Sequence, residues 1–264
     1  MRQLAILNPF DAPVYHEETV SSTMDVSRGL AAEGAPHGTV IAADFQEAGR
    51  GRRERPWNME RGNIPFTVLL RYGNIEAIPP ALTLRTGLAV ALAIEELVPG
   101  LAGAVTVKWP NDIMIRAALD TGAKKAAGIL AEAAGGTVHI GIGINVAQRE
   151  FPLSLRDKAT SISLAAGRRI APEARFTLLE TVLSRLYREL EAPDEKAGGA
   201  DWRGRLEERL YKKGEQVCFI EGAAGSDRIV EGRLAGIGSG GELLITPQGE
   251  TRARPFVTGE LRVY

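Results

Sequence analysis

The chain has 264 residues, of which 44% are hydrophobic and 25% are charged, as in ordinary globular proteins. Its formal net charge of −1 argues against a surface built to coat nucleic acid, so any strong positive field must be local. Cys218 is the one cysteine, which excludes an internal disulfide, and no apolar run reaches the roughly 20 residues that a membrane span needs. The N-terminal stretch does not have the pattern of a signal peptide, so the expected location is the cytoplasm.

The first part of the chain predicts strands interleaved with a helix. Strands are expected at 14–18, 38–45 and 64–72, where β-branched and apolar residues are frequent. A helix should follow the N-cap candidates at 21–23 and end at Gly34.

The middle of the chain predicts both helices and a hairpin. In chain order, the expected elements are a long, largely buried helix from Pro79 to about 98, a strand at 105–109, a β-hairpin of 125–133 and 137–146 that turns at Gly135-Gly136, a loop at 147–160, and helices near 172–191 and 195–209. The interleaved order indicates an α+β domain with a mixed or antiparallel sheet.

From about Leu210 the pattern changes to short strands separated by glycines. This spacing favours a small all-β barrel over residues 210–264, after an α+β domain over residues 1–209. The segment GIGSGG (236–241) matches a dinucleotide-binding fingerprint by letter, but a strand-like run follows it instead of a helix. We therefore interpret it as a turn of the barrel.

The segment GRGRRERPW, from Gly49 to Trp57, concentrates arginines between glycines directly after a buried strand. Guanidinium groups pair with oxygen anions, and glycine lets the backbone approach a ligand closely. A solvated arginine face is the alternative, but the position after a strand favours a loop that closes over an anion.

The segment KWPND, from Lys108 to Asp112, sets a lysine, an amide and a carboxylate around a stiff Trp-Pro pair. Polar groups at the end of a strand are a common place for ligand contacts. A simple turn in which Asn111 and Asp112 cap backbone amides remains an equal alternative.

Two further segments bring lysine and glycine to the expected hairpin. In KKAAGILAE (124–132), Lys125 is either a surface lysine or an ammonium at the mouth of a pocket. In GIGIN (141–145), glycine at every second position leaves one face of a strand bare, either for a ligand or for a closely packed helix.

These four motifs, in this order and at these spacings, resemble the biotin protein ligases, also called biotin–[acetyl-CoA-carboxylase] ligases. The similarity runs from about Ser21 to the end of the chain. It implies a class II synthetase-like catalytic domain followed by a small SH3-like barrel. It also implies a two-step reaction, in which biotin and MgATP give biotinyl-5′-AMP and pyrophosphate, and the acyl group then passes to a lysine of a biotin carboxyl carrier protein. A homodimer is compatible with the resemblance.

The resemblance also implies roles for individual residues. For biotin, the matching positions are Ser22, Thr23, Gln46, Gly49, Arg50, Arg52, Lys125, Gly128, Gly141 and Gly143. For ATP, they are Arg52, Arg53, Arg55, Trp57, Lys108, Asn111, Asp112 and Asn145. Arg50, Arg52, Lys125 and Asp112 are the expected catalytic residues, because fixed cations offset the repulsion between a carboxylate and a phosphate. The resemblance leaves the ligands of the metal unassigned.

Three positions depart from the family pattern. Met24 stands where asparagine is common, Glu54 where glycine is usual, and Pro65 where an aromatic residue is frequent. Repressor members of the family also carry an N-terminal winged helix-turn-helix. Here the similarity begins near residue 21, so we expect no sequence-specific DNA binding.

Three other interpretations stay open from the sequence. Lipoate or octanoyl ligases share the fold, although they usually have a glycine-rich, histidine-containing segment where this chain has arginines. A degenerate ligase that only binds biotin or its adenylate is the second. A nucleic-acid binder is the third, and both the net charge and the missing aromatic platform disfavour it.

Overall fold

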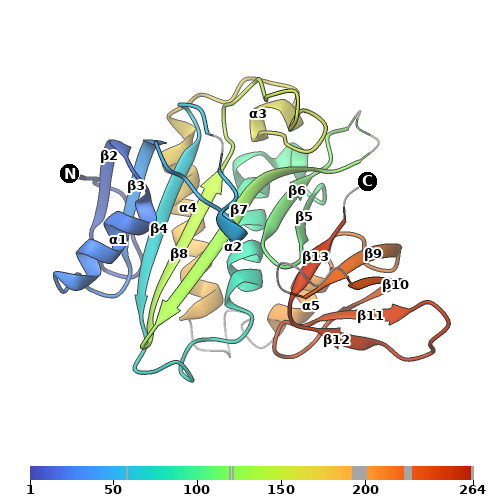
Figure 1. Ribbon diagram of the computed structural model, residues 1–264. Helices are drawn as coiled ribbons and strands as arrows, with labels where there is room; N and C mark the ends of the chain where they lie inside the picture. Colours follow the sequence, from blue (N-terminus) through green and yellow to red (C-terminus); the bar gives the residue numbers. More distant parts are fainter. Residues whose placement is uncertain (58, 119, 121, 192–200, 223–227, 263–264) are drawn as a thin grey trace.

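Two β-sheets organise the chain in the computed structural model, which describes residues 1–57, 59–118, 120, 122–191, 201–222 and 228–262 (Figure 1). The larger sheet has the strand order β1-β2-β3-β4-β8-β7-β6-β5. Its strands are β1 (Arg2–Gln3), β2 (Val14–Val20), β3 (Thr39–Gln46), β4 (Ile64–Arg71), β5 (Val105–Lys108), β6 (Asp112–Ile115), β7 (Lys124–Ala134) and β8 (Thr137–Ile144). Strands β2 and β3 run parallel and the other neighbours run antiparallel, so the sheet is mixed.

The second sheet is antiparallel and follows the order β12-β11-β10-β9-β13. Its strands are β9 (Gln216–Glu221), β10 (Arg228–Ile237), β11 (Leu243–Pro247), β12 (Arg254–Phe256) and β13 (Gly259–Leu261). The GIGSGG segment ends β10 with its first two residues and forms the turn toward β11 with residues 238–241, as expected. The two sheets and their helices confirm the expected fold class.

Helices cover both faces of the large sheet. The helices of the described residues are α1 (Thr23–Ala32), α2 (Leu82–Leu97), α3 (Ile162–Ala165), α4 (Ala174–Leu190) and α5 (Trp202–Glu207), with single 3₁₀ turns at Arg52–Glu54 and Pro99–Leu101. Figure 1 shows α2 and α4 behind the sheet, where they pack on each other, and α1 in front of it. The back face therefore holds the core, and the front face is left for α1 and for loops.

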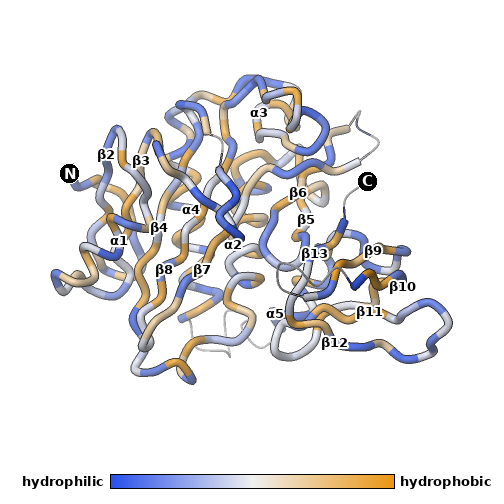
Figure 2. The backbone as a smooth tube through the Cα atoms, in the orientation of Figure 1, coloured by the Kyte–Doolittle hydropathy of each residue, from blue (hydrophilic) through white to orange (hydrophobic). Residues whose placement is uncertain are grey.

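Helix α2 is apolar around most of its surface, as predicted, because it lies between the sheet and α4. Figure 2 shows this contrast: the central strands and α2 are largely hydrophobic, and the segment after β3 that crosses in front of β7 is hydrophilic. In the described part of the chain, no helix is both long and apolar enough to cross a membrane.

Several elements differ from the expectations. Strands β1 and β6 are additional strands, and α3 is a short helix that the sequence pattern did not indicate. The helix expected near 195–209 appears as α5, and residues 195–200 lie outside the described residues. The hairpin of β7 and β8 turns at Gly135 and Gly136 as predicted, with φ of 56° and 82°, which are values that glycine adopts without steric cost.

The two sheets meet beside β5. The Trp109 indole donates from Nε1 to the carbonyl of Gly241 at 3.0 Å and packs edge-on against Phe219, with ring centroids 5.8 Å apart. Val107 also forms a backbone bridge to Leu210. The second sheet is thus fixed next to the end of β5, where the KWPND segment begins.

Candidate functional site

A cavity of about 290 Å³ opens on the front face of the large sheet and extends to the second sheet. All the sequence-predicted site residues except Gly49 line it. They are Ser22, Thr23, Gln46, Arg50, Arg52, Arg53, Arg55, Trp57, Lys108, Asn111, Asp112, Lys125, Gly128, Gly141, Gly143 and Asn145. Segments separated by more than a hundred residues therefore line the same cavity.

At one end, α1 begins with a set of hydroxyl and amide groups that are already hydrogen-bonded to one another. The Ser22 side chain caps the helix by accepting from the backbone N–H of Met24. Gln46 Oε1 accepts from the backbone N–H of Thr23 at 2.8 Å and from its hydroxyl at 3.0 Å. Thr67 of β4 then donates to the Thr23 hydroxyl at 2.9 Å. Because Ser22, Thr23 and Thr67 are buried, this end of the cavity is rigid and preorganised.

The opposite end is built on the tight turn between β5 and β6. The hairpin pairs Lys108 with Asp112, and β7 then brings Gly128 beside Asp112. Lys125 Nζ lies 2.6 Å from Asp112 Oδ1, and Lys108 Nζ lies 3.9 Å from Oδ2. The KWPND segment is therefore a turn that forms part of the cavity wall. Within the described residues, the side chains of Asn111 and Asp112 contact Arg52, Lys108, Lys125 and the Ile129 carbonyl and do not cap backbone amides, so the capping alternative was wrong.

Lys108 is the most deeply placed cation of this group. Its side chain is only 8% exposed, and burial lowers the pKa of its ammonium, while the nearby Asp112 charge acts in the opposite direction. Asn111 stands next to it, donating from Nδ2 to the Ile129 carbonyl at 2.8 Å. The Asn111 Oδ1 accepts from Arg52 at 3.3 Å, which links this turn to the arginine segment.

Residues 49–57, here called the arginine loop, form a small closed loop. Gly51 N–H donates to the Arg55 carbonyl at 2.8 Å, and Trp57 N–H donates to the Gly49 carbonyl at 2.9 Å. Gly49 does not line the cavity; a Cβ there would lie 2.9 Å from Gln46 Nε2, so glycine allows the loop to start close to this side chain. Glu54 has a φ of 54°, a left-handed conformation in which glycine is favoured.

The four arginines of this loop have different surroundings. Arg52 points inward, and burial is the main cause that lowers its pKa. Arg50 binds Asp25 of α1, with Nη2 to Oδ1 at 2.7 Å. Arg55 forms a two-pronged pair with Glu260 of β13, both distances being 3.0 Å. Arg53 donates to the Gly222 carbonyl at 3.0 Å. Among the described residues, Glu54 makes no ion pair with any of these arginines.

The bare face of the β7–β8 hairpin is covered by two side chains. A Cβ on Gly143 would lie 2.7 Å from the Trp57 ring, and one on Gly128 would lie 3.0 Å from it. A Cβ on Gly141 would lie 2.8 Å from the sulfur of Met24 in α1. Helix packing, one of the alternatives for these glycines, therefore holds at Gly141, whereas the other two face Trp57 of the arginine loop.

Two polar atoms at the Trp57 end lack partners within the described residues. Trp57 Nε1 is buried without a hydrogen bond, and so is Oδ1 of Asn145, whose Nδ2 donates to the Thr160 carbonyl at 3.1 Å. Lys125 Nζ lies 5.2 Å from the centre of the Trp57 ring, in a cation–π position. Buried polar atoms without partners are rare, so a ligand with its own donors and acceptors would complete this end.

Sequence reasoning missed several residues of the cavity. Glu260 reaches it from the second sheet, and Trp109 and Pro110 complete the wall beside Lys108. The segment around Phe151–Ala159, expected only as a loop, also lines it and is attached by the bridge between Lys125 and Ala159. Thr67 lies behind the cavity wall; the one signal for it was a hydroxyl inside an apolar strand.

Comparisons with known proteins agree with this geometry. Residues 17–147 match the model of the biotin/lipoate A/B protein ligase family. The chain is 32% identical over 200 residues to the biotin–[acetyl-CoA-carboxylase] ligase of Paracoccus denitrificans, covering 73% of this chain and 79% of that protein. It is 43% identical over 166 residues to the bifunctional ligase/repressor BirA of Bacillus subtilis strain 168, covering 60% of this chain.

Solved structures show the same architecture. A biotin protein ligase from Aquifex aeolicus, in complex with biotin and ATP, superimposes with a TM-score of 0.75 at 29% identity, covering 94% of this chain and 97% of that one. The chain spans about half the length of the bifunctional relatives from two Bacillus species, 48% in the Bacillus subtilis protein and 47% in the Bacillus spizizenii protein. Sequence identity and fold together show that the chain belongs to the biotin protein ligase family.

Proposed function

We propose that the chain is an ATP-dependent ligase that activates biotin as biotinyl-5′-AMP and transfers the biotinyl group to a lysine of a biotin carboxyl carrier protein. The observation that carries this proposal is the cluster of Lys108, Lys125 and Arg52 around one end of a cavity whose other end is a rigid set of hydroxyl and amide groups. One end suits a small polar ring, and the other suits anions.

The chemistry of adenylation explains why the cations are needed. A carboxylate oxygen attacks the α-phosphorus of ATP, a new P–O bond forms, and the bond to the pyrophosphate oxygen breaks. The two reactants are anions that repel each other, and in the transition state negative charge is spread over the equatorial oxygens of the α-phosphorus and the departing pyrophosphate oxygen. Lys125, Lys108 and Arg52 offset the repulsion because they are held in place before the substrates arrive.

The second half of the reaction moves the acyl group. The carrier lysine amine attacks the acyl carbon, AMP leaves, and the amine loses a proton. Asp112 is the proposed group that steers the incoming lysine, because its carboxylate lies in the cavity beside both lysines. In wild-type protein it pairs with Lys125, so the adenylate must compete for Lys125 and release Asp112 for this role.

The remaining positions divide between the two substrates. Ser22, Thr23 and Gln46 would bind the ureido ring, and the glycines of β7 and β8 would let it lie against the sheet. Trp57 and Asn145, with their unpaired buried atoms, would meet the adenine.

ATP would arrive with its own Mg²⁺. Among the described residues, no group of three or more His, Cys, Asp or Glu could hold a metal by itself. The oxygens of Asn111, Asp112 and Glu260 in the cavity wall are donors that suit Mg²⁺. The protein would therefore complete the coordination of a metal that the triphosphate brings.

Further properties follow from the family and are proposed with the activity. The carrier would be a subunit of acetyl-CoA carboxylase or a related carrier domain, the location would be the cytoplasm, and a homodimer is compatible with the fold. The division into a catalytic part over residues 1–209 and a β part over 210–264 is proposed as the functional one.

Biotin-dependent exchange of labelled pyrophosphate into ATP tests the first half-reaction. Lipoate and octanoate serve as parallel substrates, because the matching family model also includes lipoate ligases. We expect exchange with biotin alone. Exchange with lipoate or octanoate instead would assign the chain to the sister ligases, and measurable biotin binding without any exchange would make it a binding protein.

A pair of adjacent lysines provides the matched variants. Lys125→Ala should lower exchange by at least about two orders of magnitude, the usual effect of removing an electrostatic group from a transition state. Lys124→Ala is the control, because Lys124 lies 3.9 Å from Asp120 and does not line the cavity. Exchange at the wild-type rate in Lys125→Ala would refute the proposed role.

A further inference from the structure

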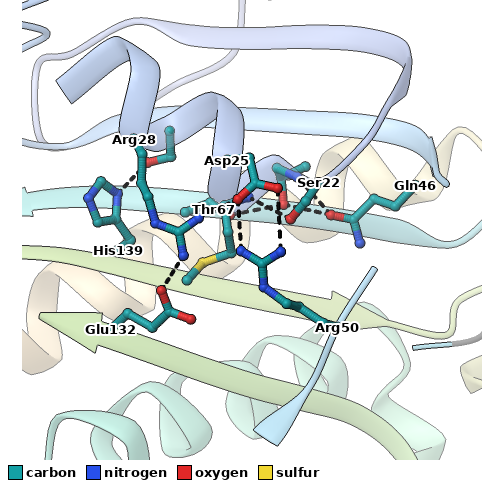
Figure 3. A network of polar contacts seen from close by, with 11 residues as sticks. Ser22, Asp25, Arg28, Gln46, Arg50, Thr67, Glu132 and His139 are labelled. Carbon is teal, nitrogen blue, oxygen red and sulfur yellow. Dashed lines mark hydrogen bonds and ion pairs between the residues drawn. The ribbon is translucent and has the colours of Figure 1, made fainter. Parts of the chain in front are cut away.

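A chain of ion pairs connects the arginine loop to the front of the large sheet (Figure 3). Arg50 Nη2 donates to Asp25 Oδ1 at 2.7 Å, and Nη1 donates to Oδ2 at 3.4 Å. The same Asp25 accepts from Arg28 on the next turn of α1, and the second amino group of Arg28 binds Glu132 of β7. The loop is thereby connected through α1 to the strand that carries Lys125.

Asp25 has a particular place in this chain of contacts. It lies in the first turn of α1, close in sequence to Ser22 and Thr23, which line one end of the cavity. Asp25 itself does not line the cavity. The hydrogen bond from Arg50 is the largest cause of the lowered pKa of Asp25, so the carboxylate is charged at neutral pH. A negative charge in the first turn is also favourable to the helix.

The arginine loop is held on two sides. Arg50 ties it to α1, while Arg55 and Arg53 tie it to the second sheet through Glu260 and the Gly222 carbonyl. Between these ties lies Arg52, whose guanidinium reaches Asn111 inside the cavity. The position of Arg52 therefore depends on both ties.

We propose that Asp25 is a positioning residue that holds the arginine loop against the cavity through Arg50, and that this hold slows the escape of a bound acyl-adenylate. The slower escape of the acyl-adenylate rests on the proposed function, whereas the hold on the arginine loop concerns the protein without ligand. Asp25 does not line the cavity, and among the described residues its carboxylate contacts Arg50 and Arg28, so its effect on the site passes through Arg50.

The expected size of the effect follows from the exposure of the pair. Asp25 is 40% exposed and Arg50 is 25% exposed, so solvent screens much of their attraction. Loss of such a pair should raise the fraction of molecules with an open loop by about two- to fivefold. The attraction between Asp25 and Arg50 should also weaken at 1 M salt, where the Debye screening length is about 3 Å.

Limited trypsin digestion of the full chain without ligand tests the hold. The loop offers trypsin cleavage sites after Arg50, Arg52 and Arg53, whereas Arg55 is protected by Pro56, and cleavage of a transiently open segment follows the open fraction. Cleavage at these three arginines, identified by mass spectrometry, should be about two- to fivefold faster in Asp25→Asn than in wild type. The difference should become small at 1 M NaCl, and the melting temperature should change little.

Two variants control for charge and for general loosening. Asp25→Glu restores a carboxylate and should be cleaved within about twofold of the wild-type rate. Glu96→Gln removes a carboxylate from a comparable pair, with Arg185 at 2.6 Å on the far side of the sheet, and should leave loop cleavage unchanged. Equal cleavage of wild type and Asp25→Asn would overturn the proposal, as would Asp25→Glu being cleaved as fast as Asp25→Asn.

The escape of the acyl-adenylate is measured separately. After biotin and ATP have reacted, the rate at which labelled biotinyl-AMP leaves the protein should be about two- to fivefold higher in Asp25→Asn. If trypsin cleavage is faster in Asp25→Asn but adenylate release is unchanged, Asp25 holds the loop but does not slow the escape of the adenylate. If the wild-type protein forms no adenylate, the proposed function fails. The digestion experiment still determines whether Asp25 holds the arginine loop.

Discussion

Replacing Lys108 with methionine should make the protein more stable while it abolishes the proposed activity. The ammonium is buried, and its nearest carboxylate oxygen, Oδ2 of Asp112, is 3.9 Å away. At an effective dielectric constant near 20, that distance gives about 4 kcal/mol of attraction. Desolvation costs several kcal/mol per ion, and the lowered pKa of Lys108 shows that this cost exceeds the attraction.

The usual penalty for removing one partner of a buried pair does not apply here. Asp112 keeps its shorter contact with Lys125 at 2.6 Å, so no carboxylate is left without a cation. Methionine preserves most of the side-chain volume. We therefore expect a gain of about 1 kcal/mol, which raises the melting temperature by about 2–4 °C in a protein of this size.

The dependence on pH provides a second check. Because the folded pKa of Lys108 lies below its unfolded value, the cost of the buried charge is fully present at neutral pH. It decreases as the pH rises from the folded pKa toward the unfolded pKa of about 10.4. The advantage of Lys108→Met over wild type should therefore be largest near pH 7 and should narrow toward pH 10.

Urea titration and thermal melts of Lys108→Met measure the gain, and pyrophosphate exchange measures the loss of activity. Lys124→Met is the matched control, because its ammonium also lies 3.9 Å from a carboxylate but is 29% exposed. This control should change stability by less than about 0.5 kcal/mol. A drop of the melting temperature in Lys108→Met would refute the reasoning, because it would mean that the buried ammonium stabilises the fold.

Three further changes have distinct expected outcomes. Gly143→Ala places a methyl group 2.7 Å from the Trp57 ring and should lower kcat/KM for ATP by about one to two orders of magnitude; wild-type kinetics would show that Trp57 moves at no cost. Glu260→Gln removes the pair with Arg55 and should increase trypsin cleavage of the arginine loop by about twofold, whereas an unchanged rate would contradict the second tie. Met24→Asn buries an amide at a site that is 4% exposed and should cost about 1–3 kcal/mol in a urea titration, and a stability equal to wild type would show that the amide finds partners there.

Local sequence pattern was enough to predict most of the architecture. The β7–β8 hairpin followed from two apolar runs around Gly135-Gly136, and α2 from a long apolar segment after two prolines. Such elements are decided by nearest neighbours and by periodicity, which the sequence displays directly. Strand β6 was harder because it has only four residues and begins inside a polar motif.

For the candidate site, too, one part was predictable from the sequence and another was not. Motifs identified the residues that line the cavity, since chemistry requires particular side chains at close spacing. The contacts that arrange those residues were not predictable. Asp25 and Arg50 are 25 positions apart, and Thr67 meets Thr23 only because β4 lies under the start of α1. No periodicity connects such pairs; tertiary packing decides them.

The pair between Arg55 and Glu260 spans 205 positions of the chain. During synthesis, the α+β part and its cavity walls can fold while the second sheet is still emerging from the ribosome. The arginine loop then has Asp25 as its partner on one side and only water on the other. If the α+β part folds first, we expect the tie of the arginine loop to Asp25 to form before its tie to Glu260, which requires β13 to join the second sheet.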